Sequence, residues 1–203
     1  SNRLLFVGDM YLRETTDMFT IGMTLPAVFG ATAPKGNYAD LETKGWEASI
    51  SWRDKFILKS KPFNYDLRFT LADNKSVITK FNNPEKYLDD FYEGMVVGEI
   101  WGYTNDGFFV DQADIDSHAD QSRFKTTNAR IIFPGDIKLM DLNGDGVVDP
   151  GTNRADDPGD RTIIGNEAPR FTFGINLGAD YNSFFFSAFF QGVGKQNWFP
   201  SRE

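Results

Sequence analysis

The stretch RFTFGINLGADY, residues 170–181, decides the fold class because apolar and polar side chains alternate along its whole length. Its apolar positions are Phe171, Phe173, Ile175, Leu177, Ala179 and Tyr181. A period of two is typical of a β-strand whose two faces meet different surroundings. We therefore predict a strand here, with one apolar face and one face of polar residues and glycine.

Four further segments show the same alternation, at 3–14, 45–54, 63–72 and 183–191. Their apolar sets are Leu4, Phe6, Met10 and Leu12; Trp46, Ala48, Ile50 and Trp52; Phe63, Tyr65, Leu67, Phe69 and Leu71; and Phe184, Phe186, Ala188 and Phe190. The composition agrees, with 15% aromatic residues and 19 glycines, a balance that favours strands over helices.

The length of these segments helps to distinguish a soluble sheet from a membrane barrel. Strands of soluble sheets usually have about 5–6 residues, whereas a tilted barrel strand needs about ten to cross a bilayer. Alternation alone leaves a soluble β-sandwich and a membrane barrel equally open. The connections favour the barrel, because short ones at 55–62 and around Asn182 alternate with long ones at 15–44 and 73–169.

The predicted fold is therefore all-β: an antiparallel meander from a large transmembrane β-barrel, with one long structured loop containing a short helix. Residues 1–72 hold strands one to three, 73–169 form a long extracellular loop, and 170–203 hold strands four and five. Five strands cannot close a barrel, which needs at least about eight, so we expect a barrel segment.

Within the long loop, local signals predict a little secondary structure. Residues 83–92 begin with an asparagine and a proline followed by acids, as short helices often do. Short strands are predicted at 107–111 and 129–133. The aromatic residues Trp101, Tyr103, Phe108 and Phe109 are expected to pack or to lie at a membrane interface rather than to stack on sugars.

Composition excludes several function classes. The formal net charge is −8, and an acidic surface repels phosphate backbones, so no nucleic-acid partner is expected. The absence of cysteine rules out disulfides, thiolate zinc sites and a cysteine nucleophile. His118 is the only histidine, no Gly-x-Ser-x-Gly elbow is present, and no carboxylate pair stands out among the 29 acids, so we predict no enzyme.

The motif DLNGDGVVD, residues 141–149, fits the start of an EF-hand-type calcium loop. Asp141, Asn143 and Asp145 would supply side-chain oxygens. Val147 would supply its main-chain carbonyl, and Asp149 would bind through a water molecule. The twelfth position is Thr152 instead of the usual bidentate Glu, so a later acid, Asp156, Asp157 or Asp160, must complete the shell. The alternative is an Asp/Asn/Gly-rich turn held by side-chain-to-backbone hydrogen bonds without a metal. We expect a structural Ca²⁺ that clips a surface loop.

Several ordered segments carry a family resemblance. They are YLRETTDMF (11–19), NYADLETKGWE (37–47), VGEIWGYTNDGFF (97–109), FPGDIKLM (133–140) leading into DLNGDG (141–146), DRTIIGN (160–166) and AFFQG (188–192). In order and spacing they resemble the SusC/RagA TonB-linked outer-membrane proteins over nearly the whole chain.

This resemblance implies a barrel of about 22 strands with an N-terminal plug, located in the cell outer membrane and energised through TonB. It also implies a SusD-like lipoprotein partner and the import of glycans, peptides or other nutrients. The matched region resembles the later part of the barrel, so we expect an internal segment that would not transport alone. In the family pattern an acid before Arg161 follows the calcium-like motif closely, which makes Asp160 the preferred closing ligand, although residues 150–159 intervene here. The alternative function is a soluble calcium-stabilised β-domain that binds carbohydrate.

Overall fold

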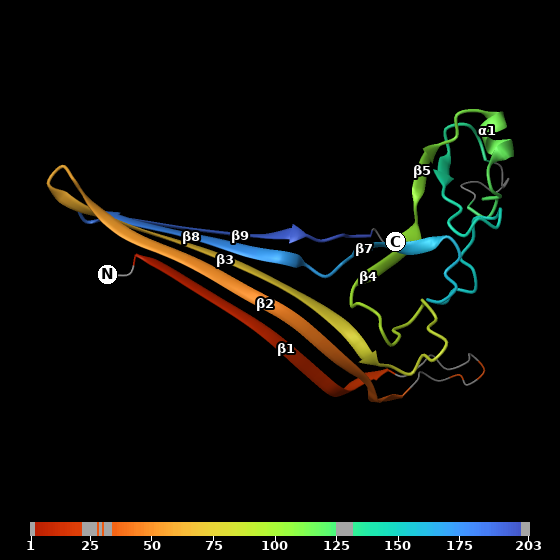
Figure 1. The fold of residues 1–203 in the computed structure, drawn as a ribbon, viewed down its shortest axis with the longest axis horizontal. Helices are drawn as coiled ribbons and strands as arrows, with labels where there is room; N and C mark the ends of the chain where they lie inside the picture. Colours follow the sequence, from red (N-terminus) through yellow and green to blue (C-terminus); the bar gives the residue numbers. More distant parts are fainter. Residues whose placement is uncertain (1–2, 22–27, 29, 31–33, 125–131, 200–203) are drawn as a thin grey trace.

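The structure is a computed structural model that describes residues 3–21, 28, 30, 34–124 and 132–199. A long curved sheet forms one part, and a smaller loop domain, the described residues 81–124 and 132–169, sits at one end of it (Figure 1). The elements in chain order are β1 (Leu4–Ile21), β2 (Lys35–Leu58), β3 (Lys61–Lys80), β4 (Glu99–Tyr103), β5 (Asn105–Phe108), α1 (Gln112–Ser117), β6 (Ile137–Leu139), β7 (Arg161–Asn166), β8 (Arg170–Tyr181) and β9 (Phe184–Lys195).

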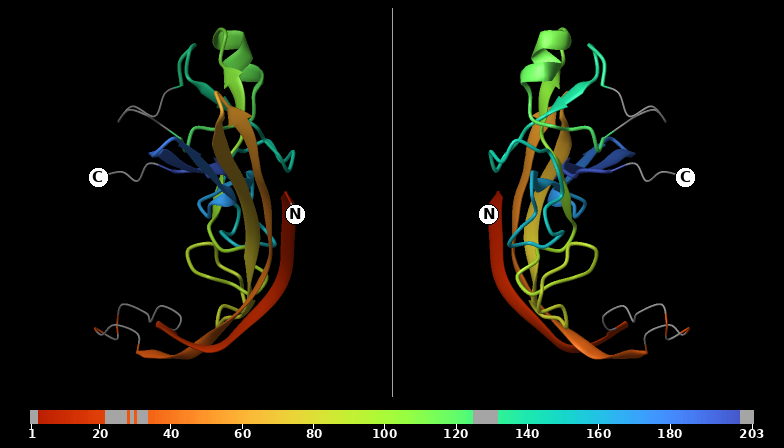
Figure 2. Two further views of the ribbon diagram at one scale, coloured as in Figure 1. Left: turned by 90° about the vertical axis from the view of Figure 1, so that its left-hand side faces the viewer. Right: turned by 90° about the vertical axis from the view of Figure 1, so that its right-hand side faces the viewer.

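The long sheet is antiparallel throughout, with the strand order β1-β2-β3-β8-β9. All five strands predicted from alternation are present, and the predicted fold class is confirmed. The sheet is curved and does not close into a barrel (Figure 2). Among the residues that the structure describes, no helix is long and apolar enough to cross a membrane.

The first three strands are longer than predicted, with 18, 24 and 20 residues. Much of the expected connection 15–44 is therefore strand, as is 73–80. Charged and hydroxyl residues occupy both faces of these extensions, in runs such as RETTD (13–17) and DLETK (40–44). Such runs carry no apolar alternation, so the sequence pattern ends before the strands do.

The strand register brings the five predicted apolar sets onto one face of the sheet. Leu4 lies opposite Trp52, Trp52 opposite Leu67, Leu67 opposite Leu177, and Leu177 opposite Ala188. Since side chains alternate with a period of two, the other members of each set follow onto the same face. Met10 and Phe186 on this face are 91% and 60% exposed, so nothing in the described part of the chain covers them.

The two short connections are tight turns at the same end of the sheet (Figure 1). Lys59 and Ser60 join β2 to β3 with φ angles of 47° and 67°, and Asn182 and Ser183 join β8 to β9 with φ angles of 48° and 73°. Positive φ at both central residues is the geometry of a two-residue hairpin turn that matches strand twist. The predicted alternation of short and long connections is confirmed.

The buried apolar side chains lie in the loop domain or at the end of β3 beside it. They are Ile78, Phe81, Tyr92, Phe109 and Val148. Two small antiparallel sheets, β4–β7 and β5–β6, organise this domain. Past its pairing with β8, β3 hydrogen-bonds instead to residues 94–97 of the loop, through Ile78 N to Met95 O at 2.9 Å and Val97 N to Ser76 O at 3.0 Å.

The helix predicted over 83–92 is wrong. Asn83 is buried, and its Nδ2 donates to the carbonyls of Tyr87 and Phe91 at 2.9 and 3.0 Å while its Oδ1 accepts from Tyr87 N. An asparagine that satisfies several main-chain groups competes with a helix and closes an irregular loop instead. The short helix of the loop is α1, capped by Asp111, whose Oδ1 accepts from Asp114 N at 2.9 Å.

The two predicted short strands of the loop have different outcomes. A strand does form near 107–111, but as β5, Asn105–Phe108, which ends before Phe109 turns into the core. For 129–133, residues 129–131 lie outside the described part, and 132 and 133 are not in a strand.

Candidate functional site: the calcium-like loop and the polar sheet face

The predicted ligands of the calcium-like loop accept hydrogen bonds from the loop's own main chain. Asp141 accepts from Gly144 N at 2.7 Å and from Gly146 N at 2.9 Å through its two carboxylate oxygens. Asn143 Oδ1 accepts from Asp145 N at 3.0 Å, and Asp145 Oδ1 accepts from Val147 N at 2.8 Å. These are the short-range side-chain-to-backbone bonds of an Asp/Asn/Gly turn.

Asp160 reaches the same loop, as expected for its closing residue. Its side chain is fully buried, and its Oδ1 accepts from Leu142 N at 2.6 Å and from Asn143 N at 3.4 Å. Its Oδ2 accepts from Asp149 N at 2.8 Å. One carboxylate thus joins the start and the end of the 141–149 loop.

The extra residues 150–159 do not displace Asp160, because they loop out and return. Asp160 N donates to Asp149 O at 2.9 Å, so the two ends of the insertion lie side by side. Gly159, with a φ of 61°, packs so closely that a Cβ there would lie 2.3 Å from Asp149 O. The insertion also contacts the 83–93 loop, where Leu88 N donates to Asn153 O at 2.9 Å.

The arrangement therefore brings Asp141, Asn143, Asp145 and Asp160 to one loop. Asp149 turns its Oδ1 to Gly151 N, at 2.6 Å, toward the insertion. Within the described ranges, no three acidic or histidine side chains converge as ligands of one ion. The structure shows the hydrogen-bonded turn that the sequence analysis gave as the alternative to a metal site. Ca²⁺ stays a proposal, because each carboxylate retains further lone pairs that could bind an ion.

The loop aromatics mostly pack. Trp101 Nε1 donates to Glu99 at 2.9 Å, the rings of Tyr103 and Phe124 lie 4.5 Å apart edge to face, and Phe109 is buried. Packing is thereby confirmed for three of the four predicted residues, whereas Phe108 is 62% exposed.

Two buried polar contacts complete the loop core. The Tyr92 hydroxyl donates to Glu99, and burial together with this carboxylate raises the pKa of Tyr92. His118 is half-buried, and its Nε2 lies 2.8 Å from Leu139 O. Both contacts hold the loop domain together rather than forming a reactive site.

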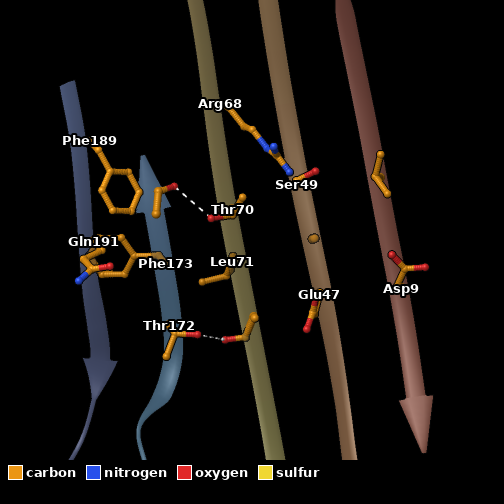
Figure 3. A pocket seen from close by; sticks show the side chains of 14 residues that line it. Asp9, Glu47, Ser49, Arg68, Thr70, Leu71, Thr172, Phe173, Phe189 and Gln191 are labelled. Atoms are coloured by element: carbon orange, nitrogen blue, oxygen red, sulfur yellow. Dashed lines mark hydrogen bonds between the residues drawn. The ribbon is translucent and has the colours of Figure 1, made fainter. Parts of the chain in front are cut away.

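The polar face of the long sheet is hollowed. One hollow of about 430 Å³ lies over β1, β2, β3, β8 and β9 (Figure 3). Its polar lining includes Asp9, Glu47, Ser49, Arg68, Thr70, Thr172 and Gln191. Thr70 Oγ1 donates to Gly174 O across the strands at 3.4 Å.

A second hollow of about 520 Å³ adjoins the first toward the N-terminal end of β1. Its charged lining is Arg3, Arg53, Asp66 and Arg68, with Ser51 and Asn176 beside them. Arg53, Asp66, Arg68 and Asn176 alternate with the apolar positions of their predicted strands, which places each of them on the polar face of its own strand. The sequence did not group them, because they come from three strands and only the register places them together.

Comparison with known proteins finds relatives named as TonB-dependent receptors. No protein-family profile matches the chain. Three curated relatives from Formosa agariphila are TonB-dependent receptor P39, at 26% identity over 93% of this chain, TonB-dependent receptor P3, at 27% over 94%, and TonB-dependent receptor P26, at 25% over 91%. The chain spans only about a fifth of their length, from 18% to 20%.

Solved structures show the same fold. The RagAB peptide transporter matches with a TM-score of 0.57 at 18% identity, over 94% of this chain and 19% of that chain. The RagAB peptide importer in its open-open state matches with a TM-score of 0.61 at 17% identity, over 95% and 19% respectively. These findings confirm the resemblance to the SusC/RagA TonB-linked outer-membrane proteins that the sequence motifs indicated.

Proposed function

We propose that this chain forms part of the wall and one extracellular loop domain of an outer-membrane transporter energised through TonB. The single observation that carries the proposal is the register. It gathers five sets of apolar side chains onto one exposed face and leaves opposite a hollowed face that is mostly polar, with Leu5, Val7, Phe185 and Phe189 among its exposed apolar members. A barrel wall between lipid and an aqueous lumen needs this division. The names of the relatives support transport rather than catalysis.

We extend the proposal to partner and cargo. By resemblance to the SusC/RagA proteins, the transporter works with a SusD-like lipoprotein and imports glycans or other nutrients. The peptide cargo named for the RagAB structures supports a nutrient of oligomeric type without selecting peptide over glycan.

The alternative, a soluble calcium-stabilised β-domain that binds carbohydrate, has less support. Such a domain would bury the apolar face of its sheet under a second layer. In the described residues the apolar face of the five-stranded sheet has no such cover, and the buried apolar residues lie at the loop end.

Cysteine labelling on intact cells tests the topology, with every cysteine outside these 203 residues replaced, because the 203 residues themselves contain none. Ser122→Cys, in the loop domain, should react with a membrane-impermeant maleimide on intact cells. Ser60→Cys, in the β2–β3 turn, should react only after the outer membrane is opened. Equal labelling of both before lysis would contradict the proposed orientation.

Deletion of the gene tests transport. Growth on a panel of glycans and peptides should fail for at least one nutrient in the deletion strain, and removal of TonB should reproduce that defect. Unchanged growth and uptake across the panel would count against a transport role.

A further inference from the structure

Both hairpin turns of the long sheet lie at the end that faces away from the loop domain (Figure 1). Three lysines are exposed at this end, Lys55, Lys59 and Lys61, and we call them the turn lysines. Residues 55–63 contain no acid, and residues 181–194 contain no charged side chain at all. The chain as a whole has a net charge of −8, so this end is locally basic in an acidic protein.

The acids nearest this end leave the turn lysines unpaired. Asp54 lies 3.0 Å from Arg3. Asp66 and Asp180 lie on the polar face, where Asp180 accepts from Asn64 Nδ2 at 2.7 Å. Within the described part of the chain, no ion pair involves any turn lysine. Their charges are therefore free to attract an anion from outside the sheet.

Lys61 belongs to the apolar face of the sheet. Leu58 pairs with Lys61 and Phe56 with Phe63, so Lys61 and Phe63 point to the same side of β3. The Lys61 ammonium donates to Asn182 Oδ1, which holds it beside the β8–β9 turn. An ammonium has three donors, so two remain for another acceptor.

An aromatic cluster lies next to Lys61 on the same face. The ring of Phe63 has three aromatic neighbours, with centroid distances of 5.0 Å to Phe56, 6.4 Å to Tyr65 and 6.1 Å to Tyr181. Aromatic rings gather where the hydrocarbon of a membrane meets the lipid head groups. Lys61 is two residues closer to the turn than Phe63, which is about 7 Å along a strand. On a barrel wall, that distance places its charge among the head groups.

The β2–β3 turn keeps polar side chains where glycine would be unstrained. Lys59 and Ser60 have φ angles of 47° and 67°. Two-residue turns of this geometry favour Asn-Gly. Strained residues that persist in a turn point to a use for their side chains. Here they place a cation and a hydroxyl group at the tip of the hairpin.

We propose that the turn end of the sheet binds the head group of an anionic phospholipid, with Lys59 and Lys61 on its phosphate. The inference rests on the proposed function, which places the aromatic cluster at the membrane boundary. Ammonium groups bind phosphate as point charges, and basic sites at a membrane surface bind lipid head groups. Ser60 and Ser183 add hydroxyl groups that suit a glycerol head group. Phosphatidylglycerol is the fitting lipid, and it would anchor this end of the wall at the membrane surface.

The experiment uses the transporter at its natural length, purified in a neutral detergent and freed of lipid. Native mass spectrometry measures binding of phosphatidylglycerol and of zwitterionic phosphatidylcholine with the same acyl chains. The test variant combines Lys59→Gln with Lys61→Gln, because a glutamine at 61 can still donate to Asn182. The matched control combines Lys35→Gln with Lys75→Gln, two exposed lysines in the opposite halves of β2 and β3.

We expect the wild type and the control to bind phosphatidylglycerol alike and in preference to phosphatidylcholine. The test variant should bind phosphatidylglycerol at least about tenfold more weakly, since charge-assisted contacts are lost. Lys59→Gln alone, which leaves the Lys61–Asn182 contact intact, should show part of this loss. Phosphatidylglycerol should raise the melting temperature of the wild type in detergent, whereas inorganic phosphate should not, because it lacks acyl chains to contact the apolar face.

Equal binding of phosphatidylglycerol by the wild type and the test variant overturns the site, as does equal binding of both lipids by the wild type. Inorganic phosphate that stabilises the wild type as much as the lipid does would identify a free-anion site and reject the lipid. The proposed function fails by a different result. A natural-length protein that stays monodisperse without detergent is not a barrel wall, whereas a detergent-dependent protein without lipid preference rejects the lipid site alone.

Discussion

At the scale of single residues, carboxylates organise the loop domain through hydrogen bonds to the main chain. Asp160 is the strongest case, because its buried oxygens accept from Leu142, Asn143 and Asp149. An amide at this position would turn an N–H group toward main-chain donors. A buried donor without an acceptor costs free energy comparable to a lost hydrogen bond.

The first prediction follows from this contact. Asp160→Asn should destabilise the loop domain by about 2 kcal/mol. Hydrogen exchange should show faster exchange at the amides of Leu142 and Asp149, with strand amides unchanged. Asp156→Asn is the control, since the Asp156 side chain is 62% exposed and bonds only to Arg154. Similar exchange in both variants would refute the assigned role of Asp160.

The melting temperature of the loop domain, with and without a chelator, tests the calcium proposal. If Ca²⁺ binds through Asp141, Asn143 and Asp145, chelation should lower the melting temperature of the loop domain, and added Ca²⁺ should restore it. Asp145→Ala should abolish this response. A melting temperature that ignores chelator, with a merely surface-like effect of Asp145→Ala, would leave the hydrogen bonds as the complete explanation of the motif.

Alkaline pH probes the buried Tyr92. Burial and then Glu99 raise its pKa above the usual value of about 10. A raised folded-state pKa means that the associated stability is present below the usual value and is lost as pH rises beyond it. The loop domain should therefore weaken above about pH 10, and Tyr92→Phe should show a flatter pH profile in hydrogen exchange. Tyr103, whose pKa burial also raises, accounts for the slope that remains. Parallel profiles would contradict this account.

At the scale of elements, two-residue turns with positive φ fix the hairpins. Ser183 has a φ of 73°, in a region where a side chain is strained and glycine is not. Ser183→Gly should stabilise the β8–β9 hairpin by about 0.5–1 kcal/mol, and Ser183→Val should destabilise it by more than that. Urea unfolding in detergent measures both. Ser187→Gly, in the middle of β9 with ordinary backbone, should instead be destabilising, and stabilisation there would undermine the turn argument.

The strands and the loop show which elements the sequence patterns predicted and which they missed. Alternation located all five long strands and their apolar faces, because period two is a local property of every strand with two unlike faces. It missed the extensions of β1, β2 and β3, where charged and hydroxyl residues interrupt the alternation. The helix expected over 83–92 failed because the amide of Asn83 bonds to Tyr87 and Phe91, a competition that only the folded loop reveals.

At the scale of the whole molecule, one ion pair joins β3 to the start of β8, next to the loop domain. Asp73, nearly buried on β3, accepts from Arg170 Nε and Nη2 at 2.5 Å each and from Phe171 N at 3.3 Å. Arg170 is the first residue of β8, and Asp73 follows Ala72, the last β3 residue paired with β8. Phe171 has a φ of 55°, so the chain enters β8 through a strained residue that this pair holds in place.

Arg170→Gln should therefore loosen the base of the loop by about 1–3 kcal/mol, because it leaves the Asp73 carboxylate poorly satisfied. The double variant with Asp73→Asn should recover part of that loss. A double-mutant cycle on unfolding in detergent gives the coupling energy. Strictly additive effects of the two changes would show that the pair does not act as a unit.

The sequence by itself determined the strand set, the division into an apolar and a polar face, the rhythm of short and long connections, and the resemblance to SusC/RagA proteins. Each of these features depends on residues that lie close together along the chain. The tertiary structure alone decided which main-chain groups Asp160 binds across the insertion, that Asp73 meets Arg170, and that Arg53 and Arg68 line one hollow. The physical reason is that such contacts depend on strand register and on the path of the backbone, which bring together residues that no local pattern connects.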